Sequence, residues 1–117
     1  MRNQPKYNFI KNTSYALKGL KELFKNETSF KIEIIFCFLL IPFIFFIETN
    51  LTNKIIMFIT LFLVPLVESL NGAIERVVDL ITLEHNEMAG KAKDAGSAAV
   101  FISIFICSIT WFFIIFN

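Results

Sequence analysis

The chain is best understood from residues 66–79, Leu66-Val67-Glu68-Ser69-Leu70-Asn71-Gly72-Ala73-Ile74-Glu75-Arg76-Val77-Val78-Asp79, which begin inside an apolar run. The polar residues of this stretch recur at i, i+3, i+7 and i+11, so a helix presents them on one side. They are Glu68, Asn71, Glu75 and Asp79. An acid within a lipid-compatible helix is costly and therefore marks a candidate functional site.

The composition indicates a membrane protein. The chain has 117 residues, 56% of them hydrophobic, with 15 Phe and a mean hydropathy of +0.65. A soluble domain of this length could not bury so much apolar surface. The length favours one domain spanning residues 1–117, and the net charge of +1 offers no large basic surface for nucleic acid.

The hydropathy pattern predicts an all-α membrane protein with one surface helix and three transmembrane helices. Residues 8–25 alternate apolar and basic positions at helical spacing, which is typical of an amphipathic helix at a membrane surface. Residues 26–29 break this pattern, with Thr28 or Ser29 as the expected cap of the next helix. The transmembrane helices are expected at 30–47, 55–75 and 95–116, with a cytoplasmic loop at 82–93.

The second crossing requires an acid at membrane depth. Residues 55–67 are uncharged but too short to span alone, so the crossing must include part of the polar stripe, beginning with Glu68. Three crossings place the N-terminal region and the 82–93 loop on the same side. Of the 11 Lys and Arg residues, all but Lys54 then lie on that side, which the positive-inside rule assigns to the cytoplasm.

Charged residues gather where each expected crossing meets the cytoplasm. Glu27 precedes the first crossing, Glu75 follows the second, and Lys93-Asp94 precede the third. Carboxylates from two helices can hold Mg²⁺, and a nearby lysine can neutralise phosphate oxygens. A deeper acid such as Glu68 can act as a general base for a lipid hydroxyl. These are the parts that phosphoryl transfer requires.

The residues alone leave other functions open. Glu68 could equally serve as a proton or ion site in a small ion-conducting oligomer, or as a structural acid paired with a neighbouring helix. Glu33 could form a simple pair with Lys31, and His85 could be a solvated loop residue or a nucleotide contact. Walker, Rossmann and protein-kinase signatures are missing from the sequence, which disfavours a soluble kinase fold.

Several blocks of sequence resemble one known family. Residues 68–79, Glu-Ser-Leu-Asn-Gly-Ala-Ile-Glu-Arg-Val-Val-Asp, resemble the signature of the prokaryotic diacylglycerol kinases, and residues 91–100 resemble their second block. Residues 14–20 and Asn26-Glu27 resemble their N-terminal region. The resemblance runs in order through nearly the whole chain.

The resemblance implies a homotrimeric lipid kinase of the bacterial inner membrane, with active sites shared between protomers. Such an enzyme phosphorylates diacylglycerol with MgATP to give phosphatidic acid and ADP. Undecaprenol kinase is the close relative and the alternative activity. The sequence of residues 96–99, Gly-Ser-Ala-Ala, resembles the diacylglycerol kinases more than undecaprenol kinase.

The resemblance also implies roles for individual residues. Glu68 is expected to be the base that activates the lipid hydroxyl, with Asn71 supporting it. Glu27 and Glu75 are expected to hold Mg²⁺ ions that bridge the ATP phosphates. The remaining implied contacts are Lys93 and Asp94 at the nucleotide, Tyr15 and Glu84-His85-Asn86 near the nucleoside, and Ser97, Trp111 and Glu33 along the lipid pocket.

Two positions depart from the family pattern. Asn8 stands where the family often has Arg, and Ala16 stands where the family can carry Ser. A phosphate or lipid contact from position 8 would therefore have to come from elsewhere, with Lys6 and Lys11 as the nearby candidates.

Overall fold

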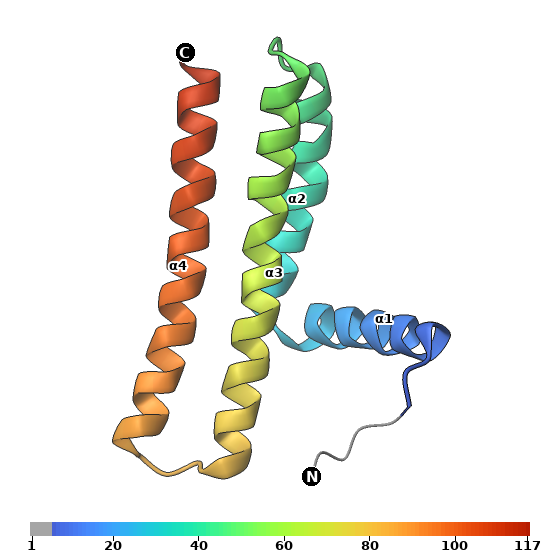
Figure 1. Ribbon diagram of the computed structural model, residues 1–117. Helices are drawn as coiled ribbons and strands as arrows, with labels where there is room; N and C mark the ends of the chain where they lie inside the picture. Colours follow the sequence, from blue (N-terminus) through green and yellow to red (C-terminus); the bar gives the residue numbers. More distant parts are fainter. Residues whose placement is uncertain (1–5) are drawn as a thin grey trace.

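The computed structural model describes residues 6–117, which form four α-helices. They are α1 Phe9–Asn26, α2 Thr28–Phe46, α3 Leu51–Ile81 and α4 Glu87–Ile115. Figure 1 shows α2, α3 and α4 running side by side, with α1 projecting sideways from the lower end of α2. Within the described residues, α2, α3 and α4 are long and apolar enough to cross a membrane. The prediction of an all-α, multi-pass membrane chain is therefore confirmed.

Asparagine side chains begin three of these helices. The side-chain oxygens of Asn8, Asn50 and Asn86 accept hydrogen bonds from backbone N–H groups three residues later, at 3.1, 2.8 and 3.0 Å. These bonds satisfy donors that the first turn of a helix leaves unpaired. The expected cap at Thr28 or Ser29 is wrong, because both lie inside α2 and Glu27 occupies its N-cap position without a side-chain cap bond.

The connection between α3 and α4 is shorter than the predicted loop at 82–93. Helix α3 continues to Ile81 and α4 begins at Glu87, so only residues 82–86 lie between them. Asn86 caps α4, and Lys91 pairs with Glu87 across one helical turn at 3.3 Å. A solvated helix carries polar residues as readily as a loop does, which is why composition alone misassigned residues 87–93.

The core at the end opposite α1 joins all three long helices. Cys37, Ile44, Met57 and Leu61 are buried there, with Cys107 and Trp111 of α4 packed against them. The indole N–H of Trp111 donates to the Met57 carbonyl at 3.2 Å, and its ring stacks on Phe43. Both cysteines are free thiols that pack in this core.

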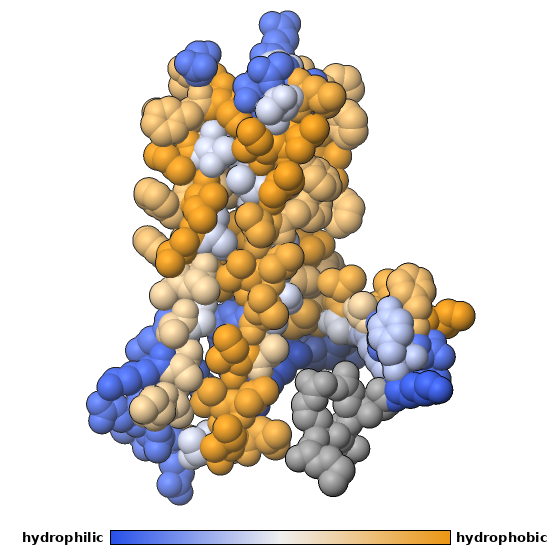
Figure 2. Space-filling model, in the orientation of Figure 1, coloured by the Kyte–Doolittle hydropathy of each residue, from blue (hydrophilic) through white to orange (hydrophobic). Residues whose placement is uncertain are grey.

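Most large apolar side chains of the long helices face outward. Figure 2 shows an apolar surface over the upper part of the bundle, with hydrophilic residues concentrated near its two ends. Helix α4 buries only Gly96 and Ser103 within this chain. A soluble monomer rarely exposes so large an apolar surface, whereas lipid or further copies of the chain can cover it.

Helices α3 and α4 approach most closely at Gly96. This glycine is buried, and a Cβ atom built there would collide with Oδ1 of Asn71 on α3. Small residues let helix backbones approach closely in lipid. Gly96 has this role here, whereas the neighbouring Ala95 and Ser97 are exposed.

We expect Gly96→Ala to destabilise the protein by about 1–3 kcal/mol, because the added methyl group has no space beside Asn71. Gly90→Ala is the matched control. It changes the same helix at a position with nothing within 4 Å of a new Cβ, and it should stabilise by about 0.5–1 kcal/mol. Unfolding in detergent micelles, followed by circular dichroism, measures both. Equal effects of the two substitutions would contradict the close approach.

Candidate functional site

Asn71 is the best-buried polar residue of the stripe on α3. Its side chain is 6% exposed, and its amide Nδ2 donates to Oε1 of Glu75 at 2.9 Å. Its Oδ1 is buried beside Gly96 without a hydrogen-bond partner among the described residues. The bond formed by Asn71 therefore orients Glu75, whereas the family resemblance implied support for Glu68.

Four carboxylates from α3 and from the start of α2 form what we call the acidic cluster: Glu27, Glu33, Glu68 and Glu75. Glu68 is half-buried, and its carboxylate lies close enough to those of Glu75 and Glu27 to interact with their charges. Glu33 interacts likewise with Glu68, and its Oε1 is buried without a partner among residues 6–117. The structure thus brings together three of the residues predicted for catalysis and metal binding.

Glu33 also lines a small cavity of about 160 Å³ between the three long helices. Cys37, Pro65 and Cys107 lie on its walls. The cavity places a carboxylate against an otherwise mainly apolar lining, which agrees with an expected contact to lipid rather than to a polar ligand.

Two cations lie on either side of the α3 stripe. Arg76 donates from NH1 to Glu22 of α1 at 2.5 Å and from NH2 to Glu27 at 2.9 Å. On the α4 side, Nζ of Lys93 donates to Asp79 at 2.7 Å. Asp79, at the polar end of the stripe, is therefore a pairing residue. These pairs link α1, α3 and α4 around the acidic cluster.

The remaining predicted site residues are dispersed in a single chain. Tyr15 is exposed on α1, Glu84 and His85 are exposed in the 82–86 connection, and Asp94 and Ser97 are exposed on α4. Asn86 caps α4. Trp111 contacts Met57, which precedes Glu68 by about 16 Å along α3 at 1.5 Å per residue. The chain by itself does not bring Trp111 to the acidic cluster.

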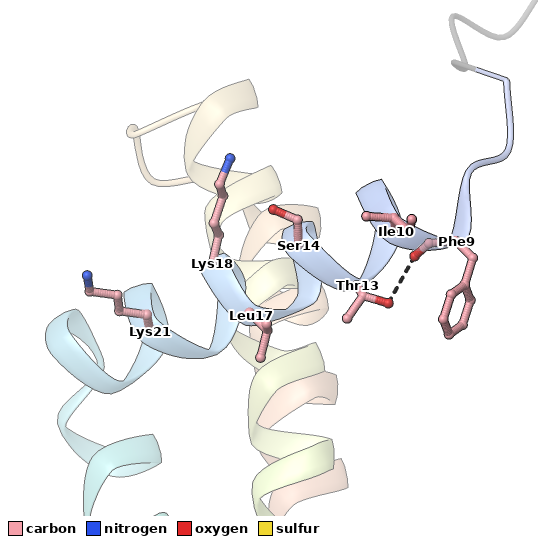
Figure 3. Close-up of a pocket in the computed structure, with 7 residues that line it drawn as sticks. All are labelled: Phe9, Ile10, Thr13, Ser14, Leu17, Lys18 and Lys21. Atoms are coloured by element: carbon pink, nitrogen blue, oxygen red, sulfur yellow. Dashed lines mark hydrogen bonds between the residues drawn. The ribbon is translucent and has the colours of Figure 1, made fainter.

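An open hollow with a volume of about 470 Å³ lies on α1. It is lined by Phe9, Ile10, Thr13, Ser14, Leu17, Lys18 and Lys21. Figure 3 shows Lys18 and Ser14 pointing to one side of the helix and Phe9 and Leu17 to the other. All its walls come from one helix, so this hollow is an open surface and not a catalytic cleft.

Glu27 and Glu75 each carry carboxylate oxygens, the type of donor that Mg²⁺ prefers. Each engages only its Oε1 in the contacts described above. The described residues contain no group of three or more His, Cys, Asp or Glu arranged to hold a metal. Mg²⁺ is usually held by one or two protein carboxylates, with water and substrate phosphate completing its coordination. Two carboxylates are therefore enough for this type of site.

The Glu22–Arg76 pair generates a pH prediction. The hydrogen bond from Asn26, and then the guanidinium of Arg76, hold the pKa of Glu22 below its usual value of 4.5. A depressed carboxyl pKa contributes stability at neutral pH, and that contribution is lost as the pH falls through the folded-state value. Wild type should therefore be more stable than Glu22→Gln at pH 7, and the difference should disappear under acid conditions. Because the pair is exposed, the difference should be small.

Thermal unfolding of both proteins in detergent, measured from about pH 7 to about pH 3, checks this expectation. A stability difference that stays constant across this range would show that Glu22 acts without its charge.

Comparison with known proteins agrees with the arrangement of these residues. The family model described as "Prokaryotic diacylglycerol kinase" matches residues 14–115, which include the acidic cluster and both flanking cations. A diacylglycerol kinase of Haemophilus influenzae is 46% identical over 102 residues, covering 87% of this chain and 86% of that protein. The diacylglycerol kinase of Escherichia coli is 39% identical, covering 87% and 84% of the two chains.

A relative with a different printed activity is also similar. The undecaprenol kinase of Bacillus subtilis is 33% identical over 92 residues, covering 79% of this chain and 75% of that protein. All these relatives share at least three quarters of their length with this chain. The chain therefore belongs to the prokaryotic diacylglycerol kinase family and is a membrane lipid kinase.

Proposed function

We propose that this protein transfers the γ-phosphate of ATP to the hydroxyl of diacylglycerol, giving phosphatidic acid and ADP. The position of Glu68 carries the proposal, because it places a carboxylate within a membrane-spanning helix beside Glu27 and Glu75. The more identical relatives, those of H. influenzae and E. coli, are named diacylglycerol kinases. Family membership also sets aside an ion-conducting or purely structural oligomer, which the residues alone had left open.

Glu68 is proposed to act as the general base. It precedes Glu75 and Asp79 on α3 and directly follows the apolar part of that helix, so the proposal places it at the level of a lipid hydroxyl. Its carboxylate would accept the hydroxyl proton while the alcohol oxygen bonds to the γ-phosphorus and the bond from that phosphorus to ADP breaks. Glu33 is proposed to contact the lipid from α2, with Ser97 and Trp111 as further lipid contacts.

Glu27 and Glu75 are proposed to hold Mg²⁺, which supplies positive charge to the phosphate oxygens when it is bound. Asn71 supports this role by fixing Oε1 of Glu75. Lys93 is proposed to contact phosphate from α4, together with Asp94. Tyr15, Glu84, His85 and Asn86 are proposed to lie near the nucleoside.

We propose that α1 lies on the cytoplasmic surface of the bacterial inner membrane. In Figure 3 Lys18 points toward the side on which α3 and α4 are joined by their short connection, whereas Leu17 points the opposite way. This arrangement suits lysines facing anionic head groups and apolar residues entering the lipid. The excess of Lys and Arg at this end of the bundle supports a cytoplasmic orientation.

We propose that the active protein is a homotrimer with shared sites. The described part of one chain presents the acidic cluster without an enclosed cleft for a nucleotide, and it leaves α4 largely uncovered. Neighbouring copies would cover the apolar faces and supply the missing walls. A shared site would also reunite residues such as Tyr15 and Asp94, which are dispersed in one chain.

Glu68→Gln should abolish turnover while leaving the protein folded and assembled, because glutamine keeps the size of the side chain but cannot accept a proton. We expect a loss of at least about a hundredfold in kcat. Glu48→Gln is the matched control: it changes an exposed carboxylate at the opposite end of the bundle and should retain full activity.

The assay is transfer of labelled γ-phosphate to diacylglycerol and, in parallel, to undecaprenol. Full activity of Glu68→Gln would reject its role as the base. Faster transfer to undecaprenol by the wild type would assign the alternative substrate, which the B. subtilis relative represents.

Glu75→Gln should raise the Mg²⁺ concentration required for half-maximal activity by about 10- to 100-fold, because one carboxylate ligand is lost. Binding of Mn²⁺ in the presence of nucleotide, followed by electron paramagnetic resonance, measures the same loss without turnover. An unchanged metal requirement would remove Glu75 from the metal site.

A further inference from the structure

Arg76 is a basic residue beside the acidic cluster to which neither the sequence analysis nor the proposed function gives a role. It follows Glu75 on α3, and its guanidinium is shared between Glu22 of α1 and Glu27 at the start of α2. The Arg76 side chain is 43% exposed, so a ligand can reach it.

The two carboxylates that hold Arg76 are not equivalent. Glu22 uses both of its oxygens, accepting from Asn26 at Oε1 and from Arg76 at Oε2. Glu27 contacts Arg76 through Oε1 alone and also interacts with the charge of Glu68. Glu22 therefore has no free oxygen and only holds the guanidinium, whereas Glu27 is also part of the acidic cluster.

We propose that Arg76 binds the phosphate groups of the nucleotide, a role that rests on the proposed kinase function. In the free protein the guanidinium is held by Glu22 and Glu27. When nucleotide binds, Arg76 exchanges its contact with Glu27 for a contact with phosphate oxygen and keeps its contact with Glu22. Arg76 and Lys93 then hold the phosphates from opposite sides of the α3 stripe.

The charge of the acidic cluster favours a second protein cation beside the nucleotide, in addition to Mg²⁺. Glu27, Glu33, Glu68 and Glu75 would together repel a polyphosphate that approaches α3. Lys93 offsets part of this repulsion from the α4 side, where it is paired with Asp79. Arg76 offers the equivalent charge on the α1 side, and its planar fork of N–H donors matches two phosphate oxygens at once.

A purely structural role for Arg76 makes a different prediction. If Arg76 only ties α1 to α3, then removing either partner of the Glu22–Arg76 pair should have the same effect. Exposed ion pairs usually contribute little to folding stability, so a tether alone offers little reason for nucleotide affinity to depend on Arg76. Comparison of variants at both positions therefore separates the two roles.

The test is equilibrium binding of a non-hydrolysable ATP analogue to the full-length protein in lipid nanodiscs, with Mg²⁺ and without lipid substrate. We expect Arg76→Gln to raise the Kd of the analogue about tenfold, as the loss of one charge-assisted contact at a partly exposed site predicts. Inorganic tripolyphosphate should compete with the analogue about tenfold more weakly on Arg76→Gln than on the wild type. Adenosine should compete equally well against both proteins, because it carries no phosphate.

Two variants serve as controls. Lys25→Gln removes one positive charge from the same membrane surface and should leave the Kd unchanged. Glu22→Gln cuts the link to α1 but keeps the guanidinium and its contact with Glu27, so the Kd should change by less than about threefold. Arg76→Lys keeps the positive charge but lacks the paired N–H donors of the guanidinium, so its Kd should be intermediate. It also provides the measurement if Arg76→Gln fails to fold.

A wild-type Kd in Arg76→Gln or, where that variant does not fold, in Arg76→Lys would overturn the proposal. So would an equal loss of affinity in Glu22→Gln and Arg76→Gln, because that result assigns Arg76 a tethering role. If the wild type itself binds no analogue, both the proposed kinase function and the proposed role of Arg76 are rejected. Normal wild-type binding with an unaffected Arg76 variant rejects the role of Arg76 alone.

Discussion

The cost of carrying a carboxylate into the bilayer governs this structure. A charged side chain within the hydrocarbon region is stable only when it faces the interior of a bundle or meets polar partners. Glu68 and Glu33 satisfy this requirement by turning toward the space between the helices, and Asn71 supplies a buried amide to Glu75. The acids nearest the wet end are instead balanced by cations. Along α3, the partner of each acid therefore changes from the buried Asn71 amide at Glu75 to a lysine at Asp79.

The packing of α4 on α3 determines where these polar partners lie. Because Gly96 has no side chain, α4 comes close enough to confine the Asn71 amide, which in turn directs its Nδ2 toward Glu75. Lys93 lies three residues before Gly96 and is thereby held within reach of Asp79. On the opposite side of α3, Arg76 connects to α1 over 54 positions of sequence. Helix α3 is thus held by α4 on one side and by α1 on the other.

Periodicity and length arguments were sufficient for the main elements of the fold. They predicted the stripe on α3 and the three apolar helices, because each depends on local spacing or on the thickness of a bilayer. They failed where local composition is ambiguous, as at residues 87–93, which are polar in a helix as they would be in a loop. They also could not find the Glu22–Arg76 pair. A long-range ion pair leaves no periodic signal, and only the packing of α1 against α3 brings the two side chains together.

The small size of this chain is compatible with kinase chemistry because phosphoryl transfer demands little covalent participation from the protein. Positioning and neutralisation of charge provide most of the catalysis, so a few carboxylates, two cations and a base can be sufficient. A bundle this narrow can place those groups on one helix face, but it cannot also enclose a nucleotide and a lipid. The same exposed apolar surface that makes the single chain incomplete gives neighbouring copies a reason to pack against it. The narrow bundle is therefore itself a physical argument for the shared site proposed above.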